Sequence, residues 1–178
     1  DRGAEAAARQ EAARLQGEVK SVLKLLDTQR REVKDAVNAA ARDAERIEGQ
    51  IRSAKSAEER ATLQASLLEV REKGALATQV DKRLREQLEA ANGLPAIEGG
   101  ISAAETALKS GHADEANSKF NAALETLNQI RAIPEEVRKQ LLDSRSQLLA
   151  QLDGKWSMSG CDSPATFTVK DSMLLQYW

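Results

Sequence analysis

A seven-residue apolar repeat near the start of the chain constrains the fold more than any other feature. Six apolar residues follow one another at intervals of seven: Val19, Leu26, Val33, Ala40, Ile47 and Ala54. A second set, four residues further on, consists of Leu23, Arg30, Val37, Ala44 and Ile51, and only Arg30 is not apolar. Spacings of four and three form one narrow apolar stripe on an α-helix. A strict seven-residue period keeps that stripe against a partner helix in a left-handed supercoil.

The same period returns in a second segment, which contains Leu63, Val70, Ala77, Leu84 and Ala91, supported by Leu67, Val80 and Leu88. Between the two segments, Ser56 followed by Glu59 has the pattern of a capping box at the start of a helix. The sequence therefore predicts a long antiparallel coiled-coil hairpin over residues 1–92, with a reversal at residues 53–56. One continuous rod is the alternative, because Ala, Arg, Ser and Lys between the segments do not stop a helix.

The apolar stripe predicts an interaction between proteins. Many of its positions are Ala, which buries little apolar area, so we expect a second copy or another domain to cover it. The first helix is longer than the second, and its Ala-rich start at residues 4–15 extends beyond the hairpin. The predicted interaction residues are Val19, Leu23, Leu26, Val33, Val37, Ile47, Ile51, Leu63, Leu67, Val70, Leu84 and Leu88.

Glycine and proline divide the chain after the hairpin. Asn92-Gly93-Leu94-Pro95 has the expected pattern of a helix stop, and Gly99-Gly100 follows. We therefore expect a joint at residues 93–100. Three further helical segments, at residues 101–110 and 113–131 and from Pro134 onward, predict a small three-helix bundle over residues 101–154, because Pro favours the first position of a helix.

Gly111, Ala116, Phe120 and Ala123 have the spacing found in the second half of a tetratricopeptide repeat. Residues 97–130 thus resemble one unit of that family, although Asn128 stands where the family has Pro and Gly100 where it has a large aromatic residue. The resemblance implies a helical hairpin that packs on its neighbours. Because stacked repeats need about three copies for stability, we do not expect a peptide-binding array.

The composition changes in the last segment, residues 155–178. Four of the five aromatic residues lie there, with both methionines and the single cysteine, Cys161. Residues 166–169 and 173–177 alternate like paired strands around a turn. Two strands alone are not stable in water, so we predict the incomplete start of a β domain, or a ribbon completed by another chain. Trp156, the turn at 161–164 and the paired strands resemble the opening of small β domains in exported bacterial proteins.

The sequence carries no catalytic or metal-binding pattern. His112 is the only histidine, and Cys161 lies far from it along the chain, so no catalytic, metal or cofactor site is expected. Cys161 is interpreted as a structural thiol or as half of a disulfide with a residue outside this sequence. Lys and Arg number 26 against 28 Asp and Glu, a net charge of −2 with no long run of one sign. This balance argues against nucleic-acid binding, and no apolar run approaches the ~20 residues of a membrane span.

The sequence therefore predicts a mainly α protein: a long antiparallel coiled-coil hairpin, a small helical bundle and a short β segment. The preferred functional hypothesis is a non-catalytic scaffold or oligomerisation module that binds a protein partner or itself, within a larger bacterial protein. The alternatives are a regulatory or spacer region of a multidomain enzyme, and a membrane-associated helical-hairpin assembly protein. The compartment is open, with the bacterial periplasm or cell envelope favoured over the cytoplasm.

Overall fold

The structure, a computed structural model, describes residues 2–152, 154–156, 165–170 and 173–177. It confirms a mainly helical fold. The helices are α1 (Arg2–Ser53), α2 (Ala57–Ala90), α3 (Gly93–Lys109) and α4 (Ala113–Leu152), followed by strands β1 (Gly154–Trp156), β2 (Ala165–Lys170) and β3 (Met173–Tyr177). The chain divides into two compact units, Asp1–Pro134 and Glu135–Trp178, and α4 contributes to both.

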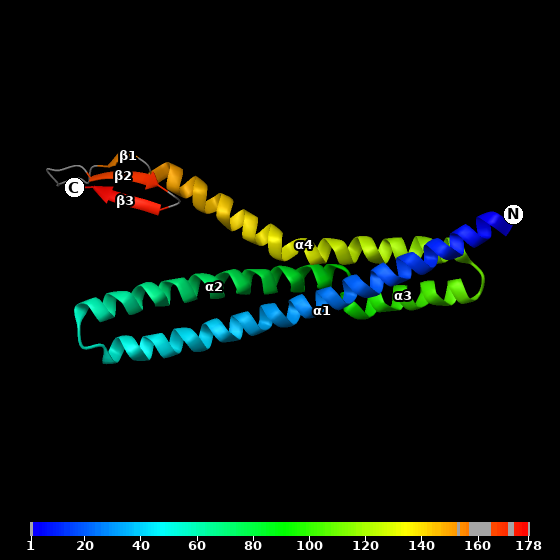
Figure 1. Cartoon of the computed structure of the whole chain (residues 1–178), viewed down its shortest axis with the longest axis horizontal. Helices are drawn as coiled ribbons and strands as arrows, with labels where there is room; N and C mark the ends of the chain where they lie inside the picture. Colours follow the sequence, from blue (N-terminus) through cyan, green and yellow to red (C-terminus); the bar gives the residue numbers. More distant parts are fainter. Residues whose placement is uncertain (1, 153, 157–164, 171–172, 178) are drawn as a thin grey trace. The chain divides into compact units, whose positions relative to one another are not determined.

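Helices α1 and α2 lie side by side and antiparallel (Figure 1). The reversal falls between Ser53 and Ala57, as the sequence predicts, so the continuous rod is wrong. Ser56 is the N-cap of α2, and its Oγ accepts a hydrogen bond from the backbone N–H of Glu59 at 3.0 Å. The Glu59 carboxylate accepts one in return from the backbone N–H of Lys55 at 3.0 Å. The first bond satisfies a donor that the first turn of a helix otherwise leaves unpaired, and the second ties the reversal to the start of α2.

A close approach between α1 and α2 occurs at Gly74. A Cβ added at this position would lie 2.9 Å from the Cβ of Ala40. Both residues are small, so the two helices come nearer here than larger side chains would allow. The many Ala positions of the stripe therefore have a packing role, since they bring the backbones of the hairpin together.

The Ala-rich start of α1 is covered by α3 and by the first part of α4. Asn92 (φ 60°) and Gly93 (φ 82°) turn the chain from α2 into α3. In α3, Glu105 accepts a hydrogen bond from Gln16 of α1 at 2.7 Å. In α4, Asn117 donates one to the carbonyl oxygen of Ala8 at 3.2 Å. We call residues 2–26 of α1, α3 and residues 113–134 of α4 the proximal bundle.

The core of the proximal bundle is the best covered part of the first unit. Phe120 is fully buried, and Gly111 (φ 86°) forms part of the turn between α3 and α4. Residues 97–130, from α3 into α4, thus form a helical hairpin packed on α1, and their resemblance to a tetratricopeptide unit stays a prediction. Other side chains with at most 1% exposure in this core are Ala12, Leu15, Val19, Leu26, Ala104, Ala116, Leu127 and Ile130.

The predicted joint at residues 93–100 is wrong, because α3 is helical from Gly93 onward. Ile97 and Ile101 are each only 7% exposed, so this segment has an apolar face to bury. Gly99 and Gly100 lie on its exposed side, where nothing approaches within 4 Å of an added Cβ. Burial of the isoleucines outweighs the weak helix propensity of two glycines, which is roughly 1 kcal/mol per residue.

The predicted three-helix bundle at residues 101–154 is also wrong. Helix α4 continues through Pro134 as one element, and its first part packs with α1 and α3. A proline inside a helix loses one backbone hydrogen bond and crowds the carbonyl four residues earlier. Ile130 and Ile133 are nevertheless buried just before it, at 1% and 5% exposure. Proline alone therefore does not mark a helix start in this chain.

In the second unit, the strands form an antiparallel sheet in the order β1-β2-β3. Phe167 of β2 lies opposite Gly154 of β1 and Gln176 of β3. That this segment begins a larger β domain stays a prediction. Cys161 and the turn at residues 161–164 lie outside the described residues.

Candidate functional site

The predicted interaction stripe divides into a covered and an open set. Six of its residues are buried, with at most 9% exposure, and the other six are only half-buried. The buried set is Val19, Leu26, Ile47, Leu67, Leu84 and Leu88. The half-buried set is Leu23, Val33, Val37, Ile51, Leu63 and Val70.

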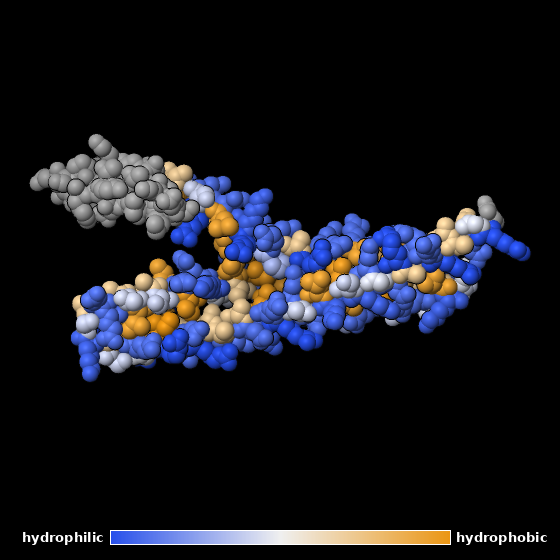
Figure 2. Space-filling model, viewed as in Figure 1, coloured by the Kyte–Doolittle hydropathy of each residue, from blue (hydrophilic) through white to orange (hydrophobic). Residues whose placement is uncertain are grey.

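The open residues gather mainly where α1 and α2 run together beyond the proximal bundle. We call residues 33–76, which comprise the end of α1, the reversal and the start of α2, the distal hairpin. Five of the six half-buried stripe residues belong to it. On the face shown in Figure 2, an apolar stripe is visible between the two hydrophilic rims of this hairpin. Two helices cover each other along one seam only, so the flanks of that seam stay accessible.

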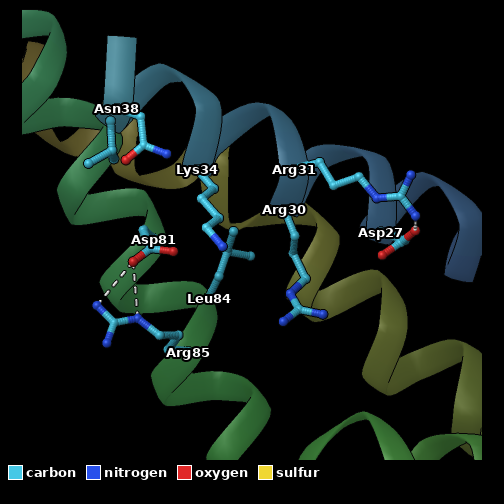
Figure 3. A pocket seen from close by; sticks show the side chains of 9 residues that line it. Asp27, Arg30, Arg31, Lys34, Asn38, Asp81, Leu84 and Arg85 are labelled. Carbon is cyan, nitrogen blue, oxygen red and sulfur yellow. Dashed lines mark hydrogen bonds and ion pairs between the residues drawn. The ribbon is translucent and has the colours of Figure 1, made fainter. Parts of the chain in front are cut away.

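A groove of about 440 Å³ lies between α1 and α2 at one flank of the seam. Figure 3 shows Arg30 and Lys34 extending from α1 into this space, with Leu84 of α2 beside them. The groove residues are Asp27, Arg30, Arg31, Lys34, Val37 and Asn38 of α1, and Asp81, Leu84 and Arg85 of α2. Four of these side chains are cationic and two are carboxylates, so the groove has an excess of two positive charges.

The two carboxylates of the groove already have partners. Asp27 pairs with Arg31, and Asp81 accepts hydrogen bonds from Arg85, with the Nε of Arg85 at 3.0 Å. In the part of the chain that the structure describes, neither Arg30 nor Lys34 forms an ion pair. The excess charge therefore belongs to these two residues, which lie one helical turn apart.

The sequence reveals Arg30 only as the residue that interrupts the apolar stripe. The structure places it half-buried at the edge of the seam. A charged residue within the apolar stripe indicates that this position does not pack into the seam between α1 and α2. Sequence reasoning missed Lys34, Asp81 and Arg85, because their nearness depends on the register between α1 and α2.

The most covered ionic contact in the first unit lies outside this groove and has a structural role. Lys20 and Gln16 of α1 hold the carboxylate of Glu105 on α3, at 2.8 and 2.7 Å. The hydrogen bond from Lys20 and then that from Gln16 lower the pKa of Glu105 below its ordinary value. On the surface of α2, the hydrogen bond from Lys73 lowers the pKa of Glu69 in the same direction. Such a shift stabilises the charged form of a carboxylate, as an ion pair does.

No group of three or more His, Cys, Asp or Glu side chains suited to a metal ion occurs within the residues described above. His112 is exposed at the turn between α3 and α4, where its backbone N–H donates to the carbonyl oxygen of Ala107 at 2.9 Å. Among the helices of the described residues, none is both long and apolar enough to cross a bilayer.

Comparison with known proteins returned no match among protein-family models, curated proteins or solved structures.

Proposed function

We propose that this chain is a non-catalytic helical scaffold that acts by protein–protein association. The distal hairpin, an antiparallel coiled coil, is the associating part, and a second copy of the chain is its partner. The proximal bundle anchors the hairpin by holding the other half of α1.

The observation that supports this proposal is the contrast in burial along one stripe. Val19 and Leu26, in the proximal bundle, are fully buried. Val33, Val37 and Ile51 continue the same stripe half-buried, and of the distal stripe residues on α1 only Ile47 is buried. The seven-residue period itself does not change between these positions. A stripe that is equally regular but less covered is suited to a further helix, because helices associate through such seams.

The free energy available from burying the exposed part of the stripe favours the same conclusion. Burial of a Val, Leu or Ile side chain contributes about 1.5–3 kcal/mol relative to full exposure, and these half-buried residues realise only part of it. A partner that covers the seam gains the remainder. Association also costs free energy, because both partners lose freedom of motion. We therefore expect complementary charges to contribute to the association beside the apolar contact.

The test is sedimentation of the full 178-residue chain over a range of concentrations. We expect reversible self-association, weakened at least tenfold by Val37→Gln, which places a polar group in the open seam. The free energy of unfolding should fall by no more than about 1 kcal/mol, since Val37 is already half-exposed.

Leu25→Gln is the matched control. Leu25 lies on the same helix and is 45% exposed, but it does not belong to the seven-residue stripe. This variant should associate as the unchanged chain does. A full-length chain that stays monomeric at every concentration would contradict the proposed function.

A regulatory or spacer region of a multidomain enzyme is the second candidate. Helix α4 favours it, because this one element begins in the first unit and continues into the second. This candidate predicts a monomer, so the sedimentation experiment also distinguishes the two.

A further inference from the structure

The open flank of α1 carries charges in a regular order. With 3.6 residues per turn, successive side chains are about 100° apart, and nine positions between residues 27 and 52 fall within an arc of about 100°. We call this set the charged arc. In chain order it consists of Asp27, Arg30, Lys34, Val37, Ala41, Ala44, Glu45, Glu48 and Arg52. None of the nine is buried.

The order of signs along the charged arc is self-complementary. It runs negative, positive, positive, then three apolar residues, then negative, negative, positive. Three pairs of opposite charges are placed nearly symmetrically about a point close to residue 39. They are Asp27 with Arg52, Arg30 with Glu48, and Lys34 with Glu45. When such a helix is turned end over end onto a copy of itself, every charge faces its opposite. A parallel copy would place like charges together.

Most of these charges are available for a partner. Within the described residues, Arg30, Lys34, Glu45 and Arg52 form no ion pair. Asp27 and Glu48 do, with Arg31 and with Arg71, yet their side chains remain 50% and 40% exposed. The arc therefore has four uncompensated charges, positive at Arg30, Lys34 and Arg52 and negative at Glu45, with Arg30 and Lys34 on one side of its apolar centre and Glu45 and Arg52 on the other.

We propose that two copies of this chain associate through the charged arcs of their α1 helices, antiparallel and about a two-fold axis near residue 39. Arg30 and Lys34 of one copy face Glu48 and Glu45 of the other, and Asp27 faces Arg52. Because a two-fold interface is isologous, each of these contacts forms twice. This inference names the geometry of the self-association in the proposed function and rests on it.

The apolar centre of the arc allows the two helices to meet. Val37, Ala41 and Ala44 are the residues nearest the axis, and two of the three are Ala, so the backbones can approach closely. Along the helix, Lys34 and Glu45 lie roughly 8 Å from the axis, and Arg30 and Glu48 roughly 14 Å. The charges thus flank a small apolar contact on both sides.

The size of this interface sets the kind of association to expect. The arc is about 40 Å long and one helix is about 10 Å wide, so each copy contributes on the order of 400 Å². Stable complexes bury about 800 Å² per partner, and transient ones less. We therefore expect a reversible dimer whose dissociation constant rises with ionic strength, since salt screens exposed charges.

The test is charge exchange in the full-length chain, followed by sedimentation. One variant carries Arg30→Glu and Lys34→Glu, and a second carries Glu45→Lys and Glu48→Lys. Each variant alone places like charges together, and we expect its self-association to weaken at least tenfold. An equimolar mixture of the two variants restores opposite charges at all these positions and should form a heterodimer. A chain that carries all four changes should form a homodimer.

The control variant carries Arg42→Glu and Arg46→Glu. These residues lie on α1 outside the charged arc and give the same change in net charge as the first variant. Circular dichroism verifies that each variant stays helical, and the mixture tests the contact even where one variant is less stable.

The outcomes separate this inference from the proposed function. Arc variants that dimerise as well as the wild-type chain would overturn the charged-arc geometry but leave self-association intact. Loss of dimerisation in the control as well as in the arc variants would overturn it too, because net charge would then explain the effect. A wild-type monomer at every concentration would overturn both.

Discussion

Replacement of Gly74 by Ala tests whether the hairpin is packed as tightly as its geometry indicates. Two effects oppose each other at this position. Alanine is the better helix former, which contributes roughly 1 kcal/mol of stability in a helix interior. The new Cβ would lie 2.9 Å from the Cβ of Ala40, and overpacking of this kind costs about 1–3 kcal/mol. We expect a net destabilisation of about 0–2 kcal/mol.

Gly17→Ala provides the reference for the helix-propensity term. Gly17 is in the interior of α1, and nothing lies within 4 Å of an added Cβ. This substitution should stabilise the protein by about 0.5–1 kcal/mol. The two variants should therefore differ by about 1–3 kcal/mol in the free energy of unfolding, measured by urea denaturation and far-UV circular dichroism. A difference of 1 kcal/mol corresponds to about 2–4 °C in Tm for a chain of this size.

The double variant Gly74→Ala with Ala40→Gly assigns the cost to the contact between these two residues. Moving the methyl group from α1 to α2 relieves the overlap, so the double-mutant cycle should show favourable coupling, on the order of 1 kcal/mol. If Gly74→Ala stabilises the protein as much as Gly17→Ala does, the helices are not in close contact here, and the packing argument fails.

Three further predictions concern the cap, the core and one ion pair. Ser56→Ala removes the acceptor for the N–H of Glu59 and should lower the free energy of unfolding by about 1 kcal/mol in urea titrations; an unchanged value would show that water replaces the cap without loss. Phe120→Ala empties a fully buried site and should cost about 3–5 kcal/mol, whereas a cost under 1 kcal/mol would mean that the proximal bundle is not closed around it. The pKa of Glu105 lies below its ordinary value in the folded protein because of Lys20 and Gln16, so this pair adds stability above the unfolded-state pKa, and the contribution disappears as the pH falls through the folded-state value; urea midpoints of the wild type and of Glu105→Gln should converge in acid, and parallel profiles would contradict the assignment.

The local signals in the sequence predict the hairpin and its reversal well. The period of Val19, Leu26 and Val33 defines one face of α1 without reference to the rest of the chain, and Ser56 with Glu59 marks a helix start through contacts within a single turn. Such features depend on neighbours in sequence, so the sequence alone contains the information.

Predictions that depend on tertiary burial are less successful. Gly93, Gly99 and Gly100 favour a joint when they are considered locally, but burial of Ile97 and Ile101 makes the segment helical. Pro134 has the signature of a helix start and yet lies inside α4. In each case, apolar contacts with other elements outweigh a local propensity of a few kcal/mol or less.

The open part of the hairpin shows the same difference between local sequence signals and tertiary burial. The repeat identifies which residues face the seam, including Val37, but it cannot tell which of them remain open, because that depends on where α3 and α4 fold back. Arg30 is visible in the sequence as an irregularity. Its relation to Lys34, Glu45 and Glu48 becomes apparent only when the uncovered flank of α1 is known.

Helix α1 belongs to two environments, since the apolar face of residues 12–26 is buried in the proximal bundle while its far end has α2 as its neighbour. Stability is therefore expected to be graded along a single helix, because local opening requires less energy where fewer contacts must break. Backbone amides near Leu15 should exchange their hydrogens only when the whole unit unfolds, whereas those near Ile51 should exchange through brief opening of the hairpin tip. The better-covered half of α1 thus holds in register a half that opens more easily.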